Sequence, residues 1–143
     1  MDKLLQELKI GHIAMIEQID QIHQVIRHYP DVKPKLRELQ TILFNHFEKQ
    51  KQKFYQLLTE YFLSDQEKSK NIQFLEQDIK NLKVKTLIFY DEHPADMGDI
   101  RPKAFIRDFQ VFSGDLTGRM YDERKYLFPL IEAYPTKKEG KEV

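Results

Sequence analysis

Residues 116–130 read LTGRMYDERKYLFPL, and this stretch decides the fold. It lies within a series of residues spaced three and four apart, which consists of Phe105, Phe109, Phe112 and Leu116, then the charged Arg119 and Glu123, and then Leu127 and Leu130. Such spacing is typical of one face of an amphipathic α-helix. Arg119 and Glu123 fall on or beside that face, four residues apart, so their side chains meet where Phe or Leu would be expected. This charged pair is either a structural ion pair in a helical core or the remnant of a metal site.

The composition of the chain excludes several classes of protein. The 143 residues carry 23 Lys and Arg against 23 Asp and Glu, and a neutral chain without a basic stripe does not favour nucleic-acid binding. The lack of cysteine excludes disulfides, thiolate ligands and cysteine nucleophiles, and is consistent with a reducing compartment. The charged first twenty residues do not predict a signal peptide, and no apolar run approaches the roughly 18 residues of a membrane span. We expect a cytoplasmic protein.

The spacing of apolar residues predicts four long helices. The first spans about 3–27 and the second about 34–62, and the two prolines within 29–34 are expected to separate these helices. A third helix follows a capping box formed by Ser64 and Glu67 and continues to about residue 91, and the fourth spans about 102–134. This pattern predicts an all-α, up-down-up-down four-helix bundle. We expect residues 1–135 to form a single domain and residues 136–143 to form a flexible polar tail.

Each predicted helix carries polar residues within or beside its apolar seam. Counting residues through the short connections between antiparallel neighbours places these polar residues at one level of the bundle. We therefore predict a single buried polar layer that consists of His12, His46, Gln50, Asp78, Arg119 and Glu123. Inward His and carboxylate side chains at one level are how helical bundles hold iron or manganese.

Along most of its length the chain resembles the hemerythrin-like, or HHE cation-binding, family. The resemblance rests on four segments, LKIGH at 8–12, NHFEKQ at 45–50, RMYDE at 119–123 and LFPL at 127–130. It implies a hemerythrin-like bundle with a His in the first helix, His-x-x-x-Glu in the second, a His in the third and His-x-x-x-Glu in the fourth. His12, His46 and Glu123 match this pattern and are the metal ligands that the resemblance implies. The implied cofactor is iron, mononuclear or dinuclear.

Three positions depart from the family pattern. Gln50 stands where Glu is expected, while Asp78 and Arg119 stand where His is expected. Gln50 cannot supply the carboxylate that bridges two iron ions, and Arg119 is permanently cationic and has no lone pair to offer a metal. Arg119 is expected to replace the metal instead, gathering Asp78 and Glu123 around a fixed positive charge. We therefore expect a degenerate metal site and no cofactor.

A second resemblance is to anti-sigma proteins of the regulator-of-sigma-D family, which are also single helical domains of similar size. It rests on His46-Phe47, on KTLIFYD at 85–91, and on Leu116-x-x-Arg119-x-x-x-Glu123. In that family the Arg and Glu of the fourth helix are expected members. The family usually has a Trp in the first helix, which this chain lacks. The resemblance implies a protein that binds the housekeeping sigma factor.

Together these features predict a non-catalytic regulatory or binding protein of bacterial type, which contacts a protein partner through an exposed aromatic-rich face. One helix seam cannot bury all the aromatic residues of the second helix, namely Phe44, Phe47, Phe54, Tyr55, Tyr61 and Phe62. The alternatives are an anti-sigma regulator and a functional iron- or oxygen-binding hemerythrin-like protein. An enzyme is not expected, because no nucleophile–base pair or Gly-rich site occurs in the sequence.

Overall fold

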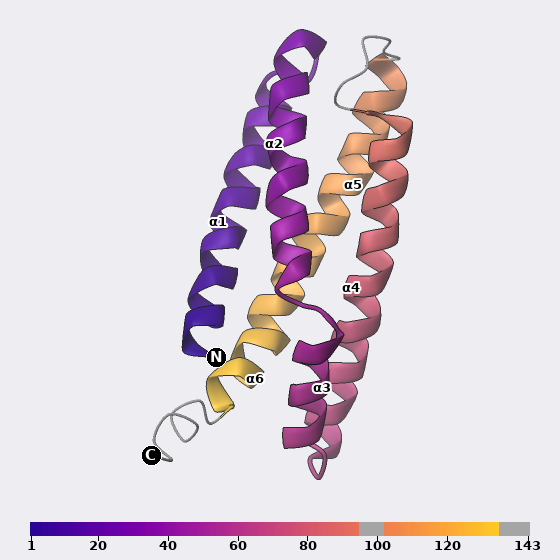
Figure 1. Cartoon of the computed structure of the whole chain (residues 1–143). Coiled ribbons are helices and arrows are strands. Elements are labelled where there is room, and N and C mark those ends of the chain that lie inside the picture. The colour runs from indigo at the N-terminus through magenta and orange to yellow at the C-terminus, as the bar shows by residue number, and fades with distance from the viewer. Residues whose placement is uncertain (95–101, 135–143) are drawn as a thin grey trace.

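The computed structural model describes residues 1–94 and 102–134, and every regular element within them is a helix. The elements are α1 (Asp2–Gln24), α2 (Tyr29–Glu48), α3 (Gln52–Tyr61), α4 (Gln66–Glu92), α5 (Pro102–Asp122), the π-helical segment η1 (Glu123–Leu127) and α6 (Phe128–Ala133). The chain rises through α1, descends through α2 and α3, rises through α4 and descends through α5 to α6 (Figure 1). The all-helical bundle predicted from the sequence is confirmed. The predicted tail, 136–143, lies outside the described residues.

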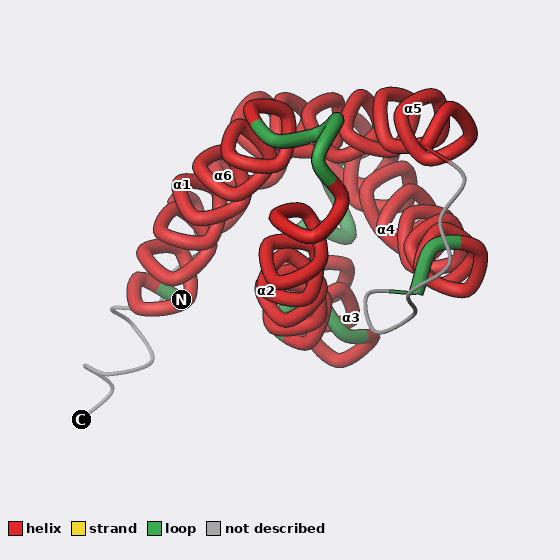
Figure 2. Tube along the Cα trace, turned by 90° about the horizontal axis from the view of Figure 1, so that it is seen from above, coloured by secondary structure: helices red, strands yellow, loops and turns green. Residues whose placement is uncertain are grey.

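Two pairs of helices enclose the core. α1 packs along α2, α4 packs along α5, and α3 packs against α4. Seen from above, α1 and α6 lie on one side of α2 and α3, and α4 and α5 lie on the other side (Figure 2). The core consists of aliphatic and aromatic residues from all of these helices, among them Leu8, Ile22, Leu36, Leu39, Leu58, Leu75, Phe109 and Leu127. None of the described helices is both long enough and apolar enough to cross a membrane.

α2 begins at Tyr29, so the prediction that residues 29–34 form the non-helical connection between the first two helices is wrong. Pro30 lies in the first turn of α2, where its missing N–H would have no partner within the helix. Pro34 lies one turn later and removes a single backbone hydrogen bond near the start of the helix. The chain turns instead at residues 25–28, immediately after α1.

The predicted continuous helix over 34–62 is interrupted between α2 and α3. Lys49 is the C-cap of α2, and Lys51, the N-cap of α3, has an extended conformation with φ −77° and ψ 174°. The local sequence consists of good helix formers, so helix propensity does not explain the break. We attribute the break to Gln50, which lies in it and has only 1% of its surface exposed. After the interruption, Tyr55 and Leu58 face the core, whereas Leu57 is exposed.

The N-terminus of α4 is capped by Asp65 rather than by the predicted Ser64. The Asp65 side chain accepts a hydrogen bond from the Lys68 backbone N–H at 3.0 Å. That contact is the standard N-cap interaction, and it shifts the helix start by one residue from the predicted capping box.

The helix that carries Arg119 widens into η1 just beyond it. The Phe128 backbone N–H donates to the Glu123 carbonyl, one residue further back than in an α-helix. Pro129 accounts for the widening, because proline lacks an N–H and its ring collides with the carbonyl four residues earlier in a regular helix. The wider turn shifts the register by one position. Leu127 and its neighbour Phe128 are consequently both buried.

Candidate functional site

The structure brings the six predicted polar residues together at one level of the bundle. They come from α1, α2, the turn before α3, α4, α5 and η1. Five of them have at most 5% of their surface exposed, namely His12, His46, Gln50, Arg119 and Glu123. Asp78 differs, because 35% of its side chain remains exposed at the edge of the layer.

Glu123 lies at the centre of this layer and its carboxylate is surrounded by four donors. Oε1 is 2.6 Å from His12 Nε2 and 2.9 Å from His46 Nε2. Oε2 accepts from Gln50 Nε2 at 2.7 Å and from Arg119 Nε at 2.7 Å. An ionised carboxylate has about four acceptor positions, so the hydrogen-bonding capacity of Glu123 is filled.

The carboxylate determines the protonation of its neighbours. A carboxylate only accepts, so both histidines carry a proton on Nε2. The Gln50 amide is oriented by its oxygen, which accepts from Tyr55 Oη at 2.6 Å and from Arg119 Nη2 at 2.7 Å. Its nitrogen therefore faces Glu123. The 3.1 Å separation between Gln50 Nε2 and His46 Nε2 is then a contact between two donors rather than a hydrogen bond.

Arg119 uses every N–H of its guanidinium. Nε donates to Glu123, Nη1 donates to the Leu75 carbonyl at 2.9 Å and to Asp78 Oδ2 at 3.2 Å, and Nη2 donates to Gln50 Oε1 and to Tyr55 Oη at 2.8 Å. Five donors directed at five acceptors in fixed directions are what a guanidinium supplies and an ammonium cannot. Arg119 thus joins α5 to α3, α4 and η1.

The ionisation of the layer follows from these contacts. Burial by itself would raise the pKa of Glu123, but the His46 ring, the hydrogen bonds from both histidines and the charge of Arg119 hold that pKa well below its ordinary value. Burial would lower the pKa of Arg119, and the neighbouring Tyr55 and Glu123 raise it instead. Burial raises the pKa of Tyr55, which keeps its proton and remains a donor to Gln50. Glu123 and Arg119 form a charged pair in a dry environment.

Two members of the network were not predicted from the sequence. The Tyr55 hydroxyl both donates to Gln50 and accepts from Arg119, and the Leu75 backbone carbonyl accepts from Arg119. A carbonyl leaves no trace in the sequence. Tyr55 lay in the aromatic run of the predicted second helix, but an uninterrupted helix would turn it about 140° away from Gln50.

A metal ion does not fit this layer in its present arrangement. His12 Nε2, His46 Nε2 and a Glu123 oxygen all lie within 4.8 Å of one another, which is close enough for three ligands of one ion. Binding through both Nε2 atoms would move the histidine protons to Nδ1. His12 Nδ1 is buried and has no hydrogen-bond partner, so a proton placed on it would have no acceptor. Arg119 would add a second positive charge beside the ion.

A second group of potential ligands lies at the end of α4. Glu92, His93 and Asp108 offer atoms within 4.8 Å of one another. His93 Nε2 is 2.8 Å from Asp108 Oδ2, and Arg107 Nε donates to the other oxygen of Asp108 at 3.1 Å. Both Asp108 oxygens are engaged, and these contacts lower the pKa of Asp108. The pair between His93 and Asp108 ties the end of α4 to α5.

Comparison of the chain with family models, with curated proteins and with solved structures returned no match. The geometry of the buried layer and of the helix surfaces therefore carries the functional argument.

Proposed function

We propose that this protein is a non-catalytic regulatory or binding protein, built on a hemerythrin-like up-down-up-down bundle in which a guanidinium replaces the metal. The proposal rests on Arg119, whose five N–H donors all have acceptors within the layer. A guanidinium supplies the positive charge that a carboxylate and inward polar groups require. Since Glu123 already accepts four hydrogen bonds, its oxygens are not available for ligation or for proton transfer.

Chelation tests the metal-independence of the fold. Protein treated with EDTA and then freed of it should retain its helical circular dichroism and its unfolding temperature, because Arg119 holds Glu123 without an ion. A protein that depends on metal would lose stability on chelation and regain it when iron, manganese or zinc is added back. That recovery would refute the proposal.

The surface that we assign to a protein partner is the groove between α4 and α5. It has a volume of about 390 Å³. Ile88 and Val111 border it with 53% and 63% of their surfaces exposed, over a floor of Phe89 and Phe112. Val84 and Leu87 extend this apolar surface along α4. These residues are mainly aliphatic, so the predicted aromatic-rich face is not what borders this groove.

The rim of this groove indicates the charge of the partner. Three carboxylates, those of Glu92, Asp108 and Asp115, line it beside a single ammonium, that of Lys85. Asp108 is already paired with His93 and Arg107, and Asp115 lies 3.7 Å from Lys85, so the rim keeps only a modest negative charge. An amphipathic helix with an apolar face and basic flanking residues complements such a rim. The groove therefore favours a basic amphipathic helix of a protein partner.

A sigma factor is the second and more specific candidate. Arg119 and Glu123 are expected members of the regulator-of-sigma-D pattern, and in this chain they form the centre of the buried network. An anti-sigma function is consistent with both the charged pair and the acidic rim of the groove between α4 and α5.

Calorimetric titration with the purified housekeeping sigma factor tests this candidate. Ile88→Glu should abolish binding, because it places a carboxylate on the apolar part of the groove. Ile13→Glu is the matched control, since Ile13 is a similarly exposed residue on α1 and does not line the groove. Absence of binding by the native protein would eliminate the anti-sigma candidate, and equal effects of the two substitutions would eliminate the groove as its site.

A further inference from the structure

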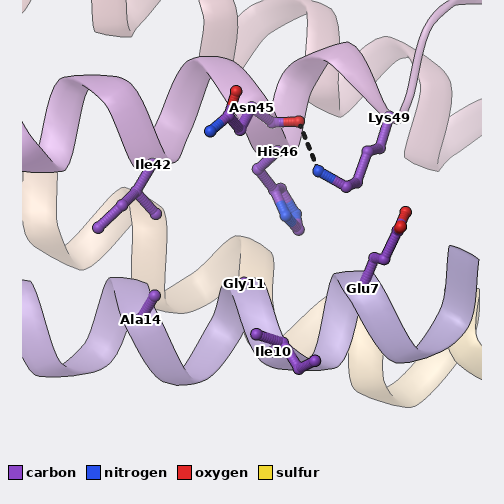
Figure 3. Close-up of a pocket in the computed structure, with 8 residues that line it drawn as sticks. All are labelled: Glu7, Ile10, Gly11, Ala14, Ile42, Asn45, His46 and Lys49. Atoms are coloured by element: carbon purple, nitrogen blue, oxygen red, sulfur yellow. Dashed lines mark hydrogen bonds between the residues drawn. The ribbon is translucent and has the colours of Figure 1, made fainter.

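A second pocket, lined by α1 and α2, reaches the buried layer from outside. It has a volume of about 270 Å³ and lies against the outer side of His46. Its walls combine apolar side chains with charged ones at one end, and the lining residues are Glu7, Ile10, Gly11, Ala14, Ile42, Asn45, His46 and Lys49. Figure 3 shows the His46 ring projecting from α2 toward α1 at the position of Gly11.

Gly11 is the reason that this pocket reaches His46. A Cβ atom added at Gly11 would lie 3.3 Å from His46 Nδ1. Any larger residue at this position would therefore press a methyl group against the ring nitrogen and cover it. Gly114 and Gly118, the other two glycines within described helices, differ from Gly11, because a Cβ atom added at either would have no neighbouring atom within 4 Å.

His46 presents an unused acceptor to the pocket. Its side chain is only 4% exposed, and its Nε2–H donates to Glu123. With the ring proton held on Nε2 by Glu123, the other ring nitrogen, Nδ1, offers a lone pair. Among the described residues, no side chain or backbone group donates to this nitrogen. A polar atom of a largely buried side chain that faces a pocket without a protein partner is a position where a ligand gains a hydrogen bond.

We propose that this pocket binds a small uncharged compound that has a compact apolar body and a single O–H or N–H donor, such as a phenol or an indole. The donor pairs with His46 Nδ1, and the apolar body lies against Ile10, Ala14 and Ile42. Lys49 Nζ, another donor at the wall of the pocket, donates to the Asn45 carbonyl at 3.4 Å and not to His46 Nδ1. A carboxylate or phosphate is disfavoured, since it would place lone pairs against the lone pair of Nδ1.

Such a ligand would act on the buried layer directly. A hydrogen bond received at Nδ1 polarises the imidazole and strengthens donation from Nε2 to Glu123. The same carboxylate binds Arg119, which joins α5 to α3 and α4. Occupancy of the α1–α2 pocket therefore influences the network that holds the two halves of the bundle together. This inference does not depend on the identity of any protein partner.

The test follows the His46 ring nitrogens by NMR during titration of ¹⁵N-labelled protein with indole. Indole should shift the Nδ1 signal saturably. Benzothiophene has the same shape without the N–H, and it should bind about tenfold more weakly, as expected for the loss of one buried hydrogen bond. Gly11→Ala should abolish the indole response by covering Nδ1, whereas Gly114→Ala, in which the added methyl group meets open space, should retain it.

Three results would overturn the proposal. They are the absence of a saturable shift with indole, equal binding of benzothiophene, and an unchanged response in the Gly11→Ala variant. If Gly11→Ala does not fold, Ala14→Leu provides the decision, because it fills the apolar part of the pocket without touching the backbone near His46. Its circular dichroism must match that of the native protein, and retained indole binding by this variant would equally refute the proposal.

Discussion

Replacement of Arg119 by methionine is the substitution to which the buried layer should be most sensitive. Methionine has a similar length and fits a core, but it lacks charge and donors. The variant would leave Glu123 with the three donors of His12, His46 and Gln50 and no cation beside it. It would also leave the Leu75 carbonyl without the donor that Arg119 supplies.

Removing one partner of a buried ion pair typically costs about 3–5 kcal/mol. A chain of this size changes its unfolding temperature by roughly 3–4 °C for each kcal/mol, so we expect a decrease of about 10–20 °C. Urea unfolding followed by far-UV circular dichroism at neutral pH gives the free energy of unfolding directly. Arg107→Met is the matched control, because Arg107 forms an exposed pair with Asp108 on the same helix, and its loss should cost less than about 1 kcal/mol.

A double-mutant cycle separates the charge pair from general packing. Glu123→Gln alone leaves the buried Arg119 cation with only the partly exposed carboxylate of Asp78 and should also be strongly destabilising. The Arg119→Met/Glu123→Gln variant removes both charges and should cost about 2–3 kcal/mol less than the sum of the single variants. Additive losses, or a cost below about 1 kcal/mol for Arg119→Met, would refute the claim that this pair organises the core.

Three further outcomes follow from the same contacts. The folded-state pKa of Glu123 is depressed, so its ionisation stabilises the fold above the unfolded-state pKa of about 4.3, and this stability is lost as the pH falls toward the folded-state value. In urea unfolding at a series of pH values, Glu123→Gln should reduce the fall in the free energy of unfolding below about pH 5. A fall equal to that of the native protein would contradict the assignment. Tyr55→Phe should cost about 1–3 kcal/mol, because Arg119 Nη2 loses an acceptor in a buried environment, and a neutral effect in the same assay would contradict the role of the hydroxyl. The Gln50→Glu/Arg119→His variant should bind stoichiometric iron or manganese, because it removes the cation and adds the carboxylate and imidazole that a metal requires. Metal content is measured by mass spectrometry after reconstitution, and a content equal to that of the native protein would contradict the view that these two positions block metal binding.

The helical architecture could be predicted from the sequence because the spacing of apolar residues follows directly from which side of each helix is buried. The apolar residues spaced three and four apart in the first helix are buried from Leu5 to Ile22, and Ile26, the last of the series, is partly buried. The series from Phe105 to Leu130 that contains Arg119 is also buried. The polar residues within these seams were identifiable for the same reason. A His or Glu at a core position is conspicuous, and its level in a bundle follows from helix length.

The features that the sequence did not predict depend on tertiary contacts. The break after α2 occurs among good helix formers, and it exists because Gln50 gains partners in Glu123, Tyr55 and Arg119. The differences in free energy that helix propensity contributes are smaller than those that such a buried hydrogen-bond network contributes. The half-exposed position of Asp78 has a similar origin, since Ile79 occupies the core while Asp78 reaches Arg119 from the edge of α4.

The π-helical segment was available to sequence reasoning but was not predicted. Pro129 lies within an otherwise continuous apolar pattern, and its effect on the preceding turn follows from proline geometry. The position of the wide turn at Glu123 places this carboxylate at the centre of the layer. A proline near the end of a predicted helix therefore deserves the same scrutiny as a polar residue within its seam.

Metal analysis of the native protein tests the central claim most directly. Protein produced with iron, manganese and zinc supplied, and purified without chelator, should contain no stoichiometric metal when measured by mass spectrometry, because Arg119 and the filled carboxylate of Glu123 occupy the layer. A content close to one ion per chain that is lost in His46→Gln would contradict the account, since it would show that His12, His46 and Glu123 act as ligands despite the guanidinium beside them.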